Sequence, residues 1–283
     1  MRTSFTKMQA LGNDFVLLDR LGADAPPLPA AAALARLADR HRGVGCDQIL
    51  VLSPPETPAA EVGYRIFNAD GSEVGQCGNG VRCVARYLWE RVGMAADGLR
   101  IAAPGGVTRV FRAGPGQVRV DMGMPRLEPR DVPFLAASAE SGPAGQHRLR
   151  LADGTVVTLG VCSMGNPHAV LECSAIEDAP VAHLGPLIET DPAFPERVNV
   201  GFVQQLDRHR LRLRVWERGV GETLACGTGA CAAMAVLRAR DAVEPVVAVG
   251  LPGGELLIEW AGAREPLWMS GPAEFVFDGT IDL

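Results

Sequence analysis

The chain has 283 residues, of which 47% are hydrophobic and 21% are charged, and its formal net charge is −6. This length suits two domains better than one core, and the composition is that of an ordinary globular protein. The acidic balance argues against a nucleic-acid binder, and neither an apolar leader nor a bilayer-spanning run occurs, so we predict a cytoplasmic protein without nucleic-acid or membrane partners.

Short apolar runs separated by Gly, Pro and Asn predict a chain built mainly of strands with a few helices. In the first half we expect strands at 5–8, 16–18 and 49–52, helices at 30–39 and 81–89, and two or three strands within 99–122. After a crossover at 125–133, we expect strands at 148–151, 155–161, 169–171 and 198–203, helices at 176–187 and 230–240, and a last strand at 275–281.

One stretch of the chain, 64–88, recurs in similar form at 213–237. A shift of 149 residues, the separation of Cys77 and Cys226, superimposes an apolar strand, a Gly-rich turn and the pattern C-G-x-G. Such internal similarity indicates a duplication. Each half therefore delivers one cysteine at the start of a helix.

Polar residues continue the parallel. Three pairs match at shifts of 153, 151 and 149 residues, each pair lying at a strand end or turn: Asn13 with Asn166 and Gln48 with Asn199 outside the two copies, and Asn68 with Glu217 within them. We predict two pseudo-symmetric halves, 1–122 and 123–270, with a cleft between them lined by amides and two thiols. The strand within 271–283 could pack on either half, and the sequence leaves this open.

The two cysteines lie where a thiol is activated. A helix N-terminus favours the thiolate, and Gly78, Asn79, Gly227 and Thr228 offer backbone N–H groups that can hold a carboxylate. Inverting an α-carbon needs a base on one face and an acid on the other, which two thiols supply.

Neither a metal nor a cofactor is expected. The seven cysteines include no C-x2-C pair, and their odd number indicates reduced thiols. Lys7 is the only lysine, and it lacks the phosphate-cradling loop that pyridoxal chemistry would need.

The motifs together resemble the diaminopimelate epimerase family over almost the whole chain. They are G-N-D-F at Gly12, G-V-G-C-D-Q at Gly43, N-A-D-G-S-E at Asn68, C-G-N-G-V-R-C at Cys77, G-N-P-H at Gly165, W-E-R-G at Trp216 and C-G-T-G-A-C at Cys226. The resemblance implies a mixed α/β (α+β) fold of two halves, each a β-sheet curled around a central helix. It also implies a homodimer that interconverts L,L- and meso-2,6-diaminopimelate for lysine and peptidoglycan synthesis.

Carried over residue by residue, the resemblance makes Cys77 and Cys226 the acid and base, tuned by His168 and Glu217. The substrate contacts that it implies are Asn13, Gln48, Asn68, Gly78, Asn79, Asn166, Asn199, Glu217, Arg218, Gly227 and Thr228. Phe277 stands where many members carry a tyrosine at the dimer contact, and Cys46 adds a third thiol near the motifs.

Two other functions remain open at this stage. One is a proline or hydroxyproline racemase of the same fold; Arg218 argues against it, because proline has no distal carboxylate to pair with the guanidinium. A non-catalytic thiol redox or binding protein would release no α-hydrogen from a labelled amino acid.

Overall fold

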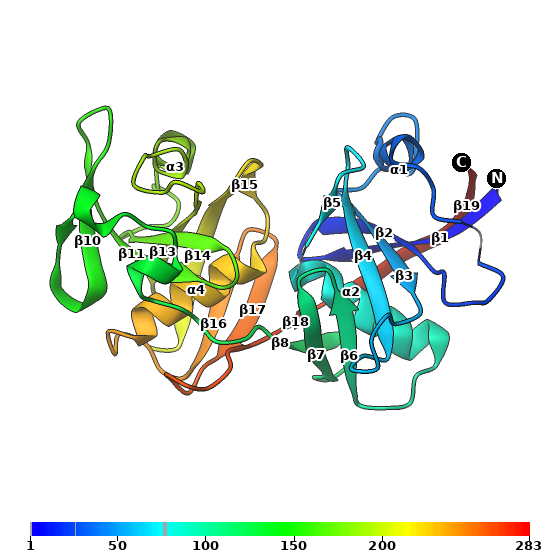
Figure 1. Cartoon of the computed structure of the whole chain (residues 1–283). Coiled ribbons are helices and arrows are strands. Elements are labelled where there is room, and N and C mark those ends of the chain that lie inside the picture. The colour runs from blue at the N-terminus through cyan, green and yellow to red at the C-terminus, as the bar shows by residue number, and fades with distance from the viewer. Residues whose placement is uncertain (1, 26, 76–77) are drawn as a thin grey trace. The chain divides into compact units, whose positions relative to one another are not determined.

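The computed structural model describes residues 2–25, 27–75 and 78–283, so Cys77 lies outside the described residues. The chain divides into two compact units, Met1–Asp121 with Ser270–Leu283, and Met122–Met269. The fold is a mixed α+β fold made mostly of strands (Figure 1), which confirms the predicted fold class.

The first unit contains strands from both ends of the chain. They are β1 (Arg2–Ala10), β2 (Asn13–Leu18), β3 (Gln48–Ser53), β4 (Val62–Asn68), β5 (Glu73–Val74), β6 (Gly98–Ala103), β7 (Gly106–Arg112), β8 (Gln117–Asp121) and β19 (Glu274–Asp282). Its helices are α1 (Ala31–Ala38) and α2 (Gly78–Tyr87), which continues as a π-helical turn at Leu88–Val92. The last strand of the chain, β19, pairs with β1.

The second unit repeats this plan. Its strands are β9 (Glu140–Ser141), β10 (Gln146–Arg150), β11 (Val156–Ser163), β12 (Pro167–Glu172), β13 (Asn199–Gln205), β14 (Arg210–Glu217), β15 (Gly221–Thr223), β16 (Val246–Leu251) and β17 (Gly254–Glu259). Its helices are α3 (Val181–Glu189) and α4 (Gly227–Arg238), with short 3-10 turns at Pro129–Asp131, Ala136–Ser138 and Pro143–Gly145. Strand β18 (Trp268–Pro272) contains the point at which the chain returns to the first unit.

The two units share one order of strand pairing. In the first, β1-β2-β3-β4-β6-β7 pair in the senses antiparallel, parallel, antiparallel, parallel and antiparallel. In the second, β11-β12-β13-β14-β16-β17 pair in the same five senses. The repeat seen in the sequence is therefore a repeat of topology.

In each unit one helix packs against the sheet (Figure 1). Helix α2 packs against β1, β2, β3, β6 and β8, and α4 packs against β11, β12, β13, β14 and β17, so strands from across each sheet reach the same helix. Helix α4 is buried on nearly all sides, as expected for a helix that is apolar all round. Its many alanines and glycines let the surrounding strands approach closely.

One predicted helix begins too early. The sequence predicted a helix over 176–187, whereas α3 starts at Val181 with Pro180 as its N-cap residue. Proline has no backbone N–H and disfavours helical geometry in the residue before it, so the helix cannot extend back through Ala179.

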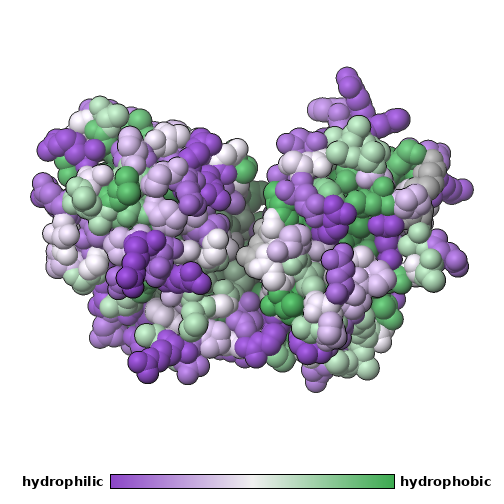
Figure 2. Space-filling model, in the orientation of Figure 1, coloured by the Kyte–Doolittle hydropathy of each residue, from purple (hydrophilic) through white to green (hydrophobic). Residues whose placement is uncertain are grey.

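The described surface is polar and contains many ion pairs. Hydrophilic and hydrophobic residues are interspersed over both units in the view of Figure 2. Within the ranges that the structure describes, no helix is long and apolar enough to cross a membrane.

Candidate active site

The strand pair that precedes the helix is held in the same way in both units. In the first, β4 pairs with β5 so that Phe67 lies opposite Glu73, and Arg65 binds Glu73 through two contacts of 2.7 and 2.6 Å. In the second, Trp216 lies opposite Glu222, and Arg214 binds Glu222 through contacts of 2.6 and 3.0 Å. In each unit this bidentate ion pair joins the two strands that precede α2 or α4.

In the first unit, the predicted amides form two hydrogen-bonded pairs. Gln48 lies opposite Asn68 on neighbouring strands, and its Nε2 donates to Asn68 Oδ1 at 3.1 Å. Asn13 follows a two-residue turn in which Leu11 and Gly12 both have positive φ. Asn79, in the first turn of α2, donates from Nδ2 to Asn13 Oδ1 at 3.3 Å. The structure therefore brings these four residues onto neighbouring strand ends and the helix start.

In the second unit, a chain of side chains leads to the cysteine. His168 Nε2 lies 3.1 Å from Asn166 Oδ1, and Asn166 Nδ2 donates to Thr228 Oγ1 at 3.4 Å. Thr228 Oγ1 in turn lies 3.6 Å from Cys226 Sγ. Since Asn166 Oδ1 can only accept, His168 donates from Nε2, and its buried Nδ1 has no hydrogen-bond partner among the described residues.

The remaining predicted contacts of this unit surround the turn after β14. Asn199 donates to the Pro167 carbonyl at 2.9 Å and accepts from the Arg218 backbone N–H at 3.0 Å, so its amide joins two backbone segments. The Arg218 side chain is exposed and donates to the Glu196 carbonyl at 2.8 Å. Glu217 accepts a hydrogen bond from Thr223.

The pKa of Cys226 corrects the expectation of an activated thiolate. Cys226 is the N-cap residue of α4 and only 5% exposed, and burial raises its pKa well above the usual range, with the Glu217 charge adding to the rise. The helix start does supply hydrogen bonds from Thr228 and the Gly229 backbone, but desolvation outweighs them. Cys226 is a thiol at rest.

His168 is neutral at physiological pH. It is 1% exposed, and burial, helped by the Arg218 charge, lowers its pKa to about 3. Because the unfolded chain then binds more protons between pH 3 and 6.5, the free energy of unfolding falls as the pH drops through this window.

We predict that replacing His168 by phenylalanine weakens this acid sensitivity. Phe15 occupies the matching place in the first unit, since it lies opposite Gln48 as His168 lies opposite Asn199. Between pH 6.5 and 5 the native protein should lose about 2 kcal/mol more unfolding free energy than H168F. Urea denaturation at the two pH values measures the difference, and parallel curves would show that His168 contributes nothing.

Cys46 and Phe277 both make apolar contacts. Cys46 is buried in the apolar core of the first unit among residues such as Val16 and Leu37, and burial raises the pKa of its thiol to about 12. Cys46 is thus packed as part of the apolar core. Phe277 is 48% exposed and packs edge-on against Phe5, with ring centroids 5.8 Å apart.

Sequence reasoning missed several polar residues that hold the site. Arg82 of α2 is fully buried and donates to Asn79, and Asp47 accepts from Asn13. Both lie inside the quoted motifs C-G-N-G-V-R-C and G-V-G-C-D-Q, which was the available signal. Glu189, which accepts from Trp216 and Gly219, lies in no motif and had none.

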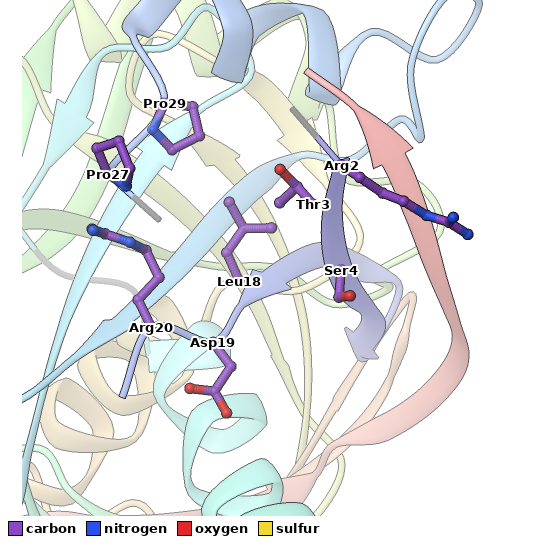
Figure 3. Close-up of a pocket in the computed structure, with 8 residues that line it drawn as sticks. All are labelled: Arg2, Thr3, Ser4, Leu18, Asp19, Arg20, Pro27 and Pro29. Carbon is purple, nitrogen blue, oxygen red and sulfur yellow. The ribbon is translucent and has the colours of Figure 1, made fainter. Parts of the chain in front are cut away.

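A separate cavity in the first unit has a volume of about 250 Å³. It is lined by Arg2, Thr3, Ser4, Leu18, Asp19, Arg20, Pro27 and Pro29, and it contains none of the predicted site residues (Figure 3). The Arg2 side chain points away from the others in this view.

Similarity to known proteins identifies the family of this chain. The family model described as diaminopimelate epimerase matches residues 5–128 and 160–276. The chain belongs to the diaminopimelate epimerase family. A diaminopimelate epimerase of Halorhodospira halophila is 54% identical over 99% of this chain and 95% of its own length. That of Alkalilimnicola ehrlichii is 51% identical over the full length of both chains.

More distant solved structures share the fold of this diaminopimelate epimerase family member. A hydroxyproline epimerase from Agrobacterium vitis has a TM-score of 0.69 at 14% identity, covering 99% of this chain and 92% of its own. A Bacillus anthracis phenazine biosynthesis protein of the PhzF family has a TM-score of 0.69 at 15% identity over the full length of both. At this identity the likeness concerns the fold alone.

Proposed function

We propose that the protein is an isomerase that interconverts L,L- and meso-2,6-diaminopimelate with two cysteines and no cofactor. The observation that carries this proposal is the duplicated strand–turn–helix unit, which in the second unit presents Cys226 at the start of α4. Full-length relatives at 51–54% identity that are named diaminopimelate epimerase support the same substrate. In the cell, this reaction would serve lysine and peptidoglycan synthesis.

In this mechanism Cys77 and Cys226 act on opposite faces of the α-carbon. One thiolate takes the α-proton and the other thiol returns a proton, so the centre inverts. Cys226, protonated at rest, is the acid in the direction in which Cys77 takes the proton. The roles exchange in the reverse direction, when Cys226 must first lose its proton.

The substrate is held by the remaining predicted residues. Neutral His168 and charged Glu217 tune the Cys226 side, and Arg218 pairs with the distal carboxylate of the substrate. The other contacts in this proposal are Asn13, Gln48, Asn68, Gly78, Asn79, Asn166, Asn199, Gly227 and Thr228. Backbone N–H groups at the two helix starts would stabilise the charge that develops on the reacting carboxylate.

The proposal extends to the cellular and oligomeric setting. We propose two domains that correspond to the compact units, a cytoplasmic location, and a homodimer. For the dimer, the support is the exposed apolar surface of β19, where Val276 is 54% and Phe277 is 48% exposed.

Chiral analysis in deuterium oxide tests the function. L,L-diaminopimelate incubated with the reduced protein should give the meso form carrying deuterium at the inverted carbon, because the returned proton comes from a different thiol. Proline, incubated in parallel, should not be inverted. Turnover of proline in place of diaminopimelate would favour the racemase alternative, and no deuterium uptake with either would favour a thiol-binding protein.

A further inference from the structure

Arg82 is a buried arginine at the start of α2. Its side chain is fully buried, and it donates from Nη2 to Asn79 Oδ1 at 3.0 Å and from Nη1 to the Gly78 carbonyl at 3.3 Å. Its Nε donates to the carbonyl of Pro272 at 3.1 Å. A guanidinium can only donate, so whatever it contacts must accept. The side chain of Asn79 therefore turns its oxygen toward Arg82.

Asp47 has the opposite character on the other side of the same cluster. Its Oδ2 accepts from Asn13 Nδ2 at 2.8 Å and from the Asp14 backbone N–H at 3.0 Å. Its Oδ1 accepts from Arg40 at 2.9 Å, and Arg40 also binds Asp14. An ionised carboxylate can only accept. The side chain of Asn13 therefore turns its nitrogen toward Asp47.

The two asparagines join these ends in one consistent direction. With its nitrogen toward Asp47, Asn13 presents Oδ1 to Asn79, and Asn79 supplies Nδ2 at 3.3 Å because its own oxygen faces Arg82. Rotating either amide by 180° would place nitrogen against nitrogen or oxygen against oxygen. The acceptor-only and donor-only ends thus exclude the flipped orientation of both amides.

At the matching positions of the second unit, which the structure describes throughout, neither a carboxylate nor a guanidinium is present. The shift of 149 residues places Cys231 where the first unit has Arg82, and the shift of 151 places Val198 where it has Asp47. There the matching amide, Asn166, is held by His168 and Thr228, which can each donate or accept. The charged control of amide direction is therefore specific to the first unit.

We infer that Asp47 and Arg82 are positioning residues that fix, from opposite ends, the amide orientation of Asn13 and Asn79. This inference rests on the proposed function, in which both asparagines contact the substrate. With the amides fixed, the substrate meets one pattern of donors and acceptors and not an average of two. Asp47 and Arg82 act through the asparagines and need no contact with the substrate.

A double-mutant cycle tests the inference. D47N replaces the acceptor-only end by a group that can also donate, so Asn13 can flip. We expect KM for diaminopimelate to rise on the order of 10-fold with a smaller change in kcat, because a polar contact to a charged substrate is lost in part of the molecules. In the N13A background the same substitution should change KM less than about 2-fold. Equal effects in both backgrounds would overturn the inference.

The matched control is D207N in the second unit. Asp207 also accepts from a backbone N–H, that of His209, and from an arginine, Arg210, and its side chain is 40% exposed against 44% for Asp47. D207N should leave KM unchanged. At the Arg82 end of the hydrogen-bonded series, R82K keeps a donor-only group and should raise KM less than R82Q, whose amide can present an oxygen. The reverse order would contradict the inference.

Side-chain amide NMR separates this inference from the proposed function. The Asn13 side-chain amide should give one set of ¹⁵N–¹H resonances in the native protein and a shifted or doubled set in D47N, and this readout needs no substrate. Unchanged Asn13 resonances would overturn the inference. Absence of diaminopimelate epimerisation by the native protein, with the NMR result as expected, would instead overturn the proposed function.

Discussion

C226A is expected to lose diaminopimelate epimerisation by at least about 10³-fold in kcat/KM, because in the proposed mechanism Cys226 carries the proton on its face of the α-carbon. Cys226 occupies the N-cap position of α4 and is 5% exposed, so water cannot readily take over its role. Chiral analysis of the product measures the loss. Exchange of the α-hydrogen, measured separately, should persist partly if Cys77 still acts alone.

The control lies on the same helix. Cys231 is fully buried in α4, and C231A removes the same sulfur without touching the proposed chemistry, so it should keep most of the activity. Both variants should unfold near the native temperature, which separates loss of chemistry from loss of fold. A C226A protein that epimerises at more than a tenth of the native rate would refute the two-cysteine mechanism.

Features set by local sequence could be predicted, and the repeat shows this most clearly. The shift that aligns Cys77 with Cys226 also aligns Arg65 with Arg214 and Glu73 with Glu222, and the structure joins each arginine to its glutamate. A strand, a tight turn and a helix start depend on neighbouring residues, which a sequence displays directly. The mixed α+β fold class was implied by the family resemblance that the motifs carry.

Features set by burial and by distant partners could not be predicted. The helix start at Cys226 indicated a lowered pKa, whereas the packing of α4 inside its sheet buries the thiol and raises it. Asp47 is 34 residues from Asn13, and the hydrogen bond between them exists only because β2 and β3 lie side by side. The motif around Asp47 marked the region, but the partner of its carboxylate is evident only in the folded chain.

E189A is expected to destabilise the second unit more than the removal of an exposed carboxylate does. Glu189, the last residue of α3, is 4% exposed and accepts from Trp216 Nε1 and the Gly219 backbone N–H, each at 2.7 Å. Arg197 lies 3.0 Å from the same carboxylate. Alanine would leave the indole and the backbone donor without their partner, at a cost of about 3 kcal/mol.

The effect should appear both in stability and at the site. A loss of about 3 kcal/mol corresponds to a fall of roughly 6–12 °C in the melting temperature of a unit this size. As a control, E177A removes the exposed partner of Arg212 and should cost less than about 1 kcal/mol. Below its melting temperature E189A should also bind diaminopimelate more weakly, because Glu189 holds the turn that carries Glu217 and Arg218. If E189A melts with the native protein, then water replaces the carboxylate at these donors and the turn does not depend on it.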